Sequence, residues 1–175
     1  MQVPSFSVRI ARKSDIPRIK EIFASARRFM AENGNPQWSD GYPYDVVIDE
    51  GVTGGNFRVA ESEGVVAAVW SVYESDEEYD EIDGMWLTDV NCRNANYIAV
   101  HTLAVAENYR GKGLARAALN SAAEEAVSLR KNSLRMDTHV KNLPMQRLLT
   151  DLGFSMCGRI KARGESSFLC FEKVL

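Results

Sequence analysis

The chain has 175 residues, of which 45% are hydrophobic and 26% are charged, and its formal net charge is −3. These values are typical of an ordinary globular protein, and we expect residues 1–175 to form a single domain. The longest apolar run, about Val65 to Trp70, is too short to cross a bilayer, so no membrane partner is expected.

The first part of the chain predicts a strand, two helices and a hairpin. Phe6–Ala11 alternates weakly like a strand, and apolar residues at helical spacing predict a helix from Ile16 to about Glu32. The loop "NGNPQWSDGYP" follows, and a short helix is predicted from Tyr44 to Glu50. "FRVAES" and "VVAAVWSVY" then predict the two strands of a tight hairpin.

The second part begins with an acidic segment and then alternates strands with helices. "ESDEEYDEIDG" should be an exposed loop, because it has too few apolar residues to bury. "NYIAVHTLAV" is the most strand-like run and is predicted to be central to the sheet. A helix from Ala115 to Leu129, the strand "SLRMDTHV", a helix from Pro144 to Gly153 and the strands "FSMCGRI" and "SSFLCFEKVL" follow. This order predicts a mixed α/β fold with one sheet and helices on both faces.

Charge and cysteines narrow the function further. Val59 to Cys92 contains ten acidic residues and no Lys or Arg, whereas the rest of the chain has 21 basic and 14 acidic residues. The chain outside this segment is therefore basic, and a basic protein can bind nucleic acid. No nucleic-acid motif with interleaved aromatics occurs, however, so we expect no such partner. Three widely spaced cysteines fit neither a disulfide framework nor a zinc site, which predicts a cytoplasmic location and no metal.

A glycine-rich stretch, "ENYRGKGLARAAL", joins the central strand to an alanine-rich helix. Free N–H groups at a helix start attract anions, and Gly111 and Gly113 allow close approach of a ligand to the backbone. Arg110, Lys112 and Arg116 add positive charge, so phosphate is the expected ligand. The stretch is not a P-loop, because Gly113 follows the Gly-Lys pair, and it lacks the third glycine of a dinucleotide fingerprint.

The pattern Arg110-x-x-Gly113-x-Ala115 after a central strand resembles the hallmark of the GNAT superfamily of acyl-CoA-dependent acetyltransferases. "DTHVKNLPMQRLLTDLGF", with Asn142 and a closing Gly-Phe pair, is similar to the second motif of that family. The resemblance covers essentially the whole chain. It implies a GNAT-like fold: a single mixed, mostly antiparallel sheet of about seven strands with splayed central strands. It also implies acetyl-CoA as co-substrate.

The resemblance implies a set of cofactor contacts. In this family the pantetheine arm of coenzyme A lies where the fourth strand splays from the fifth and pairs with backbone groups like an extra strand. The residues that would contact the arm are Leu103, Ala104 and Val105, and those that would surround the pyrophosphate are Arg110, Gly111, Lys112, Gly113, Leu114 and Ala115. Asn142 would bind the pantetheine or lie near the thioester; alternatively it is only the N-cap of the next helix.

The proton-transfer groups are less clear from the sequence. The family often protonates the leaving thiolate with a tyrosine, and Leu149 occupies that position here. The histidines His139 and His101 have a suitable pKa for acid–base catalysis, or each is a packed core histidine. Asp137 could orient His139 or act as a base through water, or it could form a salt bridge with Arg135 or another neighbour. The backbone N–H near Leu103 would polarise the thioester carbonyl.

The acceptor site has only indirect signals. In the family the acceptor site is lined by the segment after the first helix and by the segment before the fourth strand. Here the first segment offers Trp38 and Tyr42 as flat apolar walls, and the second offers Tyr79 and Trp86. Nearby acids would attract a cationic amine, or they form a solvated surface only.

The sequence therefore predicts an N-acetyltransferase that moves an acetyl group from acetyl-CoA to a primary amine of a small molecule or peptide. The alternative is a sensor that binds acyl-CoA without catalysis, which the leucine at the usual tyrosine position favours. A homodimer is possible in this family through the last strands, where "SSFLCFEKVL" could pair.

Overall fold

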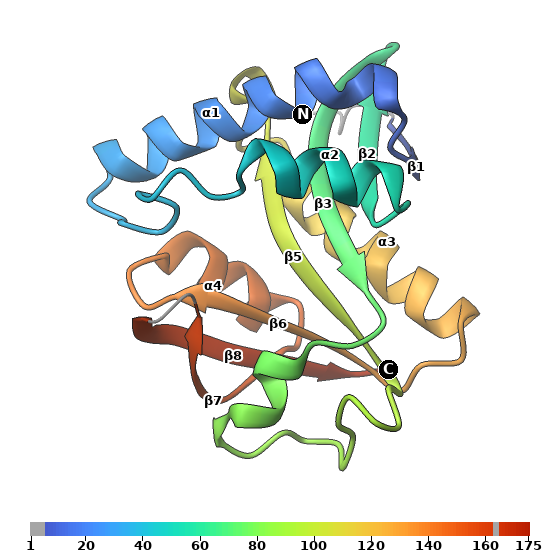
Figure 1. Cartoon of the computed structure of the whole chain (residues 1–175), viewed down its shortest axis with the longest axis vertical. Helices are drawn as coiled ribbons and strands as arrows, with labels where there is room; N and C mark the ends of the chain where they lie inside the picture. Colours follow the sequence, from blue (N-terminus) through green and yellow to red (C-terminus); the bar gives the residue numbers. More distant parts are fainter. Residues whose placement is uncertain (1–5, 163–164) are drawn as a thin grey trace. The chain divides into compact units, whose positions relative to one another are not determined.

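An open sheet with the strand order β1-β2-β3-β5-β6-β8-β7-β4 organises the computed structural model, which describes residues 6–162 and 165–175 (Figure 1). The strands are β1 (Ser7–Ile10), β2 (Phe57–Ser62), β3 (Val65–Tyr73), β4 (Asp83–Gly84), β5 (Tyr97–Val105), β6 (Ser133–His139), β7 (Ser155–Ala162) and β8 (Glu165–Val174). β5 and β6 are parallel, whereas β1–β2, β2–β3, β6–β8, β7–β8 and β4–β7 are antiparallel. The predicted mixed, mostly antiparallel sheet is confirmed.

The sheet has eight strands in the described residues, one more than the seven predicted. The additional strand, β4, has two residues and lies inside the acidic segment that was predicted to be a loop. Its pairing with β7 brings Gly84 opposite Gly158, and a Cβ on either glycine would lie 2.2 or 2.4 Å from a backbone oxygen of the other strand. β4 therefore depends on two residues that have no side chain.

The helices lie close to their predicted ranges. They are α1 (Ile16–Glu32), α2 (Asp45–Thr53), α3 (Leu114–Ser128) and α4 (Leu143–Asp151), with short 3-10 helices η1 (Lys13–Asp15), η2 (Glu77–Glu81) and η3 (Glu107–Tyr109). α2 extends three residues beyond its predicted end. Among the described residues, no helix is both long enough and apolar enough to cross a bilayer.

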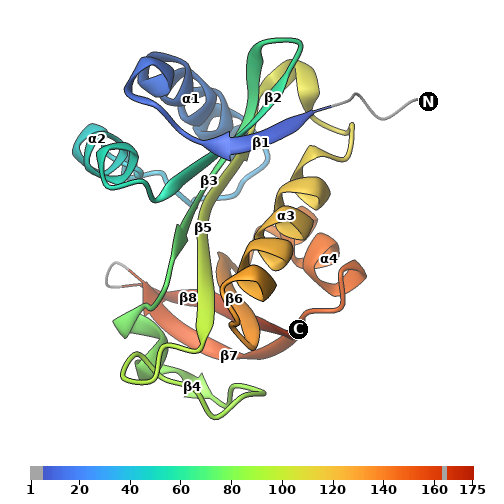
Figure 2. The same ribbon diagram turned by 90° about the vertical axis from the view of Figure 1, so that its right-hand side faces the viewer.

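The chain divides into two compact units. Unit 1 is formed by Met1–Val72 and Thr102–Ser121, and unit 2 by Tyr73–His101 and Ala122–Leu175. In unit 1, α1 and α2 lie on one side of β1–β3, and the first part of α3 lies on the other (Figure 2). Phe23 of α1 is fully buried and packs edge-on against Trp38 and Phe57 at ring-centroid distances of 5.7 and 6.2 Å.

The part of β5 that belongs to unit 1 begins with an unusual backbone conformation. Thr102 has φ 53°, in the left-handed region that a β-branched residue rarely adopts, at a strain of about 1–3 kcal/mol. Its buried hydroxyl is 2.8 Å from that of Ser71, which holds the residue in place. The backbone of β5 thus departs from extended geometry at the place where the family resemblance implies a bulge.

In unit 2, β6 has different neighbours along its two edges. It pairs with β8 over its whole length, from Ser133 to His139. Its parallel pairing with β5 covers only three residues and ends at Ala99 and Arg135, although both strands continue beyond that point. This early end of the pairing is the splay expected of the central strands.

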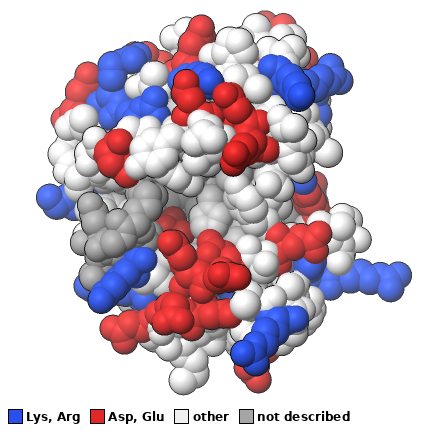
Figure 3. Space-filling view, viewed as in Figure 1, with Lys and Arg blue, Asp and Glu red and all other residues white. Residues whose placement is uncertain are grey.

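The acidic segment from Glu74 to Asp83 differs from the exposed loop that was predicted. Figure 3 shows many acidic side chains on the surface in the region of η2 in Figure 1, and Glu77, Glu78, Asp80 and Glu81 are exposed. Within the same turn, however, Tyr79 is fully buried and packs in a core with Tyr97 and Phe168. One aromatic residue thus anchors a segment that composition alone assigns to solvent.

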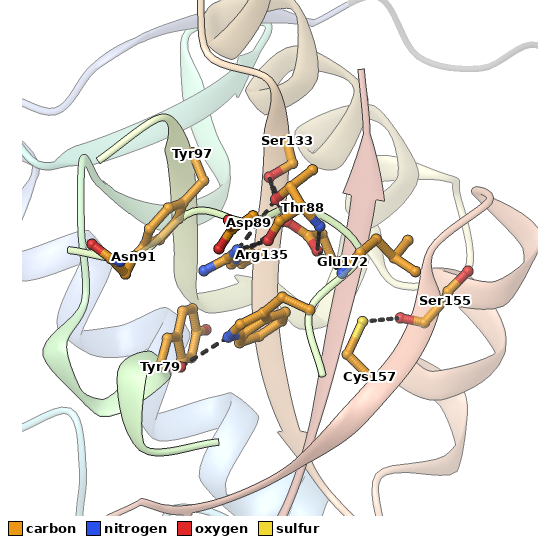
Figure 4. Close-up of polar contacts among 12 residues, drawn as sticks. Tyr79, Thr88, Asp89, Asn91, Tyr97, Ser133, Arg135, Ser155, Cys157 and Glu172 are labelled. Carbon is orange, nitrogen blue, oxygen red and sulfur yellow. Dashed lines mark hydrogen bonds and ion pairs between the residues drawn. The ribbon is translucent and has the colours of Figure 1, made fainter. Parts of the chain in front are cut away.

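A buried ion pair fixes the chain that follows this segment (Figure 4). Arg135 and Glu172 are opposite each other on β6 and β8, both are fully buried, and Arg135 Nε donates to Glu172 Oε1 at 3.0 Å. The Glu172 carboxylate also accepts the N–H groups of Leu87 (2.6 Å) and Thr88 (3.1 Å). Because one carboxylate bonds both to β6 and to the loop, it fastens residues 87–88 to the sheet.

Replacement of this carboxylate tests its contribution to stability. We expect Glu172→Gln to lower the free energy of unfolding by roughly 3–5 kcal/mol, because it leaves the buried Arg135 charge uncompensated. Urea unfolding measures the loss. Glu124→Gln, at an exposed position on α3, is the control and should change stability by less than about 0.5 kcal/mol. Equal stabilities of the two variants would contradict this role.

Candidate active site

The predicted phosphate-binding loop lies in unit 1 between η3 and α3. Gly111 and Gly113 have φ values of 72° and 84°, which only glycine adopts without strain. A Cβ on either glycine would meet no protein atom within 4 Å, so both face open space. The first backbone hydrogen bond of α3 joins Ala117 N–H to the Gly113 carbonyl at 3.0 Å. The loop therefore lies at the N-terminus of α3, the helix end whose dipole favours an anion.

Two cationic side chains of the loop have protein partners. The Arg110 guanidinium donates to Ser25 Oγ at 2.6 Å and lies 4.6 Å above the Phe29 ring, so its side chain is held against α1. The Lys112 ammonium lies 5.4 Å from the centre of the Tyr109 ring. Both charges add to the positive end of the α3 dipole. The loop can thus bind a phosphate group through backbone N–H groups inside a positive field.

The other predicted cofactor residues lie on two different elements. On β5, Ala104 is buried while Leu103 and Val105 are half-buried. In unit 2, Asn142 is the N-cap of α4, and its Oδ1 accepts the N–H of Met145 at 3.4 Å. The capping alternative for Asn142 is therefore observed, and its contact with a cofactor stays a prediction.

A cluster of three charged side chains in unit 2 contains two of the predicted catalytic residues. His101 Nε2 lies 2.8 Å from Asp76 Oδ2, and His101 Nδ1 lies 3.4 Å from Asp137 Oδ1. The hydroxyl of Tyr79 donates to the same Asp137 oxygen at 2.9 Å. The three charged side chains retain 12–21% exposure, so the cluster is partly open to solvent. Asp137 therefore contacts His101 and Tyr79, and not Arg135, which pairs with Glu172.

The surroundings change the ionisation of this cluster. Burial alone would lower the pKa of His101, but hydrogen bonds and charge interactions with Asp137 and Asp76 outweigh it and raise the pKa to about 10. Burial tends to raise the pKa of Asp76, but the contact with His101 lowers it below its ordinary value. The pKa of Tyr79 is raised well above its usual range by burial and by both carboxylates, so its hydroxyl remains a donor.

The second histidine has different surroundings. His139 is 4% exposed, its ring packs edge-on against Phe168 at 5.5 Å, and its Nδ1 accepts the N–H of Lys141 at 3.1 Å. These are the features of a packed core histidine, and its catalytic role stays a prediction. Leu149, at the usual tyrosine position, is fully buried and offers no proton to a thiolate.

All four aromatic residues predicted to line an acceptor site have structural contacts within their own units. Trp38 is 7% exposed beside Phe23, and Tyr79 is fully buried. The Trp86 indole donates to the Tyr79 carbonyl at 2.8 Å and lies 4.3 Å from the Arg135 guanidinium. Tyr42 is half-buried and packs against Tyr44 at 5.7 Å.

Sequence reasoning missed Asp76 as a member of the cluster, because it treated the acidic run as a surface feature. A signal was present in β6, where the alternate residues Ser133, Arg135, Asp137 and His139 share one face of the strand. A polar row on a central strand needs polar partners, and here His101, Tyr79 and Glu172 provide them, with Asp76 joining the cluster through His101.

Comparison with known proteins gives one family. The family model for the GNAT acetyltransferases matches residues 17–154. A GNAT-family acetyltransferase from Streptococcus agalactiae is 30% identical, with a TM-score of 0.86 over 100% of this chain and 98% of that chain. A second one, from Listeria monocytogenes, is 22% identical, with a TM-score of 0.75 over 97% of this chain and 95% of that chain.

A protein from Salmonella typhimurium, solved with its cofactor acetyl-CoA, has the same fold. It is 20% identical, with a TM-score of 0.68 over 98% of this chain and 94% of that chain. No curated protein matches the sequence. Because the family model covers more than half of the residues and the streptococcal structure agrees over the whole chain, the protein belongs to the GNAT family of acetyltransferases.

Proposed function

We propose that the protein is an N-acetyltransferase that moves an acetyl group from acetyl-CoA to a primary amine of a small molecule or peptide. The observation that carries this proposal is the loop before α3, where two glycines in the left-handed region leave open space at the N-terminus of the helix. A pyrophosphate fits both the charge and the backbone of this loop. Family membership makes coenzyme A the natural source of that pyrophosphate.

In this proposal the protein binds the cofactor mainly through backbone groups. The N–H groups from Arg110 to Ala115 would hold the pyrophosphate, and those of Leu103 to Val105 the pantetheine arm. Acetyl-CoA supplies an activated acetyl thioester. The strained residue Thr102 precedes Leu103, whose N–H would polarise the thioester carbonyl.

Asp137 is the group best suited to take the proton of the amine. Among the described residues, both contacts of its carboxylate fall on Oδ1, which leaves Oδ2 to accept a proton from the amine directly or through water. The amine nitrogen attacks the carbonyl carbon, the C–S bond breaks, and its electron pair leaves with sulfur. Since Leu149 cannot donate, the thiolate takes a proton from water. His101, with carboxylates at both ring nitrogens, is a poor base.

The cellular setting belongs to the same proposal. All three cysteines are free, as expected of a protein in a reducing cytoplasm. A homodimer would need a surface other than the predicted pairing of the last strand, because β8 is already paired along both edges, with β6 and β7.

Substitution in the glycine loop tests the cofactor site. We expect Gly113→Asp to weaken acetyl-CoA binding at least ~100-fold, or ~2.7 kcal/mol, because it adds a side chain and a negative charge where the phosphates would lie. Isothermal titration calorimetry measures the change. Gly34→Asp is the matched control, since Gly34 is exposed and also has a positive φ, 69°. Equal losses in both variants would indicate a general effect of strain, and the loop would then not be a phosphate site.

A transfer assay tests the reaction and separates it from the sensor alternative. With acetyl-CoA and a panel of primary amines, the protein should release one free thiol for each acetylated amine. Asp137→Asn should keep acetyl-CoA affinity and lower kcat about 10²–10⁴-fold, because an amide cannot accept the proton. Glu77→Gln, at an exposed acid, is the control. Tight acetyl-CoA binding without thiol release would instead support the sensor.

A further inference from the structure

His101 is flanked by carboxylates at both of its ring nitrogens. Asp76 Oδ2 lies 2.8 Å from Nε2, and Asp137 Oδ1 lies 3.4 Å from Nδ1. A neutral imidazole carries hydrogen on only one nitrogen, so one of these contacts would then place a lone pair against a carboxylate. With both carboxylates ionised, only the imidazolium satisfies both contacts, so the geometry favours the charged form.

Asp76 reaches this position because its backbone is fixed. The Tyr97 hydroxyl accepts the Asp76 N–H at 2.7 Å and lies 3.1 Å from the Asp76 carbonyl. The second carboxylate oxygen, Oδ1, accepts the N–H of Glu78 at 2.8 Å, which caps η2. This leaves Oδ2 for His101. Asp76 is therefore held in the cluster by hydrogen bonds of its backbone and its carboxylate, unlike its exposed neighbours in the acidic segment.

The acidic segment contributes a second residue to the cluster, Tyr79 of η2. Tyr79 donates to Asp137 Oδ1, and its ring centre lies 5.6 Å from that of His101. His101 and Tyr79 thus both hold the same oxygen of Asp137. Because these two contacts hold Oδ1 of Asp137, they also fix the orientation of its second oxygen, Oδ2.

We propose that Asp76 is a positioning residue for acetyl transfer: with Asp137 it holds His101 as an imidazolium, and His101 in turn fixes Asp137 to receive the proton of the amine. This inference rests on the proposed function. Among the acids of the acidic segment, Asp76 then supports catalysis, whereas the exposed acids do not. Asp76 acts through His101 and does not itself contact the reacting atoms.

The groups that face His101 in the described residues come from three elements, β3, η2 and β6, and from the residue that precedes η2. Tyr73, at the end of β3, contacts its ring at 5.8 Å, and Tyr79 of η2 contacts it at 5.6 Å. Asp76 precedes η2, and Asp137 lies on β6. Tyr79 keeps its proton because its pKa is raised well above its usual range, so the two carboxylates dominate the balance of charge.

The direction of the pH dependence follows from the raised pKa of His101. The ion pairs are complete below the usual histidine pKa of 6.5 and are lost as the pH rises through about 10. At the acid end, Asp76 has a lowered pKa, so its contribution is lost only as the pH falls below the ordinary range of an aspartate. The cluster is therefore intact at neutral pH.

An NMR titration of the two imidazoles of the chain tests the charge of His101 without any substrate. In the wild type, we expect the His101 signal to stay protonated through neutral pH and to titrate near 10. Asp76→Asn should lower this pKa by at least ~1 unit, because one of two facing charges is removed. Asp76→Glu should restore most of the shift, and Glu77→Gln should leave the wild-type value.

The pH dependence of kcat/KM tests whether the charge of His101 affects acetyl transfer. With one amine acceptor for all variants, the alkaline limb of kcat/KM should move down by at least ~1 pH unit in Asp76→Asn and stay in place in Glu77→Gln. Because every variant is assayed with the same amine, the titration of the amine is the same in each profile and does not affect the comparison. A merely structural residue would lower the rate at every pH without moving the limb.

The results separate this inference from the proposed function. A His101 that titrates near 6.5 in the wild type, or equal shifts in Asp76→Asn and Glu77→Gln, would overturn the role of Asp76 while acetyl transfer stands. An alkaline limb unmoved in Asp76→Asn would do the same. If no amine is acetylated by the wild type, the proposed function fails and the positioning role fails with it, whatever the charge of His101.

Discussion

The parallel pairing of β5 and β6 ends after three residue pairs, and much of unit 2 depends on this early end. Had the two strands stayed paired, their backbone groups would have been satisfied along their whole length. Instead, β6 continues to pair with β8 alone, from Met136 to His139. This second half of β6 carries Asp137 on the same face as Arg135, and the chain from Asp76 to Thr88 covers that face with specific polar contacts.

The buried polar groups in unit 2 form two clusters with different chemistry. In one, Arg135 and Glu172 are completely buried, and their charges cancel within a network that also binds residues 87–88. In the other, two carboxylates share one imidazolium and remain partly exposed, which leaves a net negative charge. A closed and neutral network stabilises a fold, whereas a partly open and charged one can exchange protons with a ligand. This difference supports a structural role for Arg135 and a chemical role for Asp137.

Local patterns predicted the regular elements well, and long-range contacts explain what they missed. The helical spacing of apolar residues gave α1 its observed bounds, and the glycine loop was found because its chemistry lies within one short stretch. The burial of Tyr79 could not be read from its neighbours, because its contacts are with Tyr97 on β5 and Asp137 on β6. β4 was missed for the same reason, since its partner on β7 lies far along the chain. The ionisation of His101 likewise depends on two residues that sequence spacing does not bring together.

The distribution of tryptophans gives the protein a built-in optical probe. Of the three tryptophans, Trp38 and Trp70 are in unit 1, and Trp86 alone is in unit 2. Trp86 lies over a buried guanidinium, and its N–H is bonded to the carbonyl of Tyr79, the residue that anchors the acidic segment. Its emission should therefore respond to the packing of that segment, so a variant with phenylalanine at positions 38 and 70 would follow unit 2 by fluorescence without an added label.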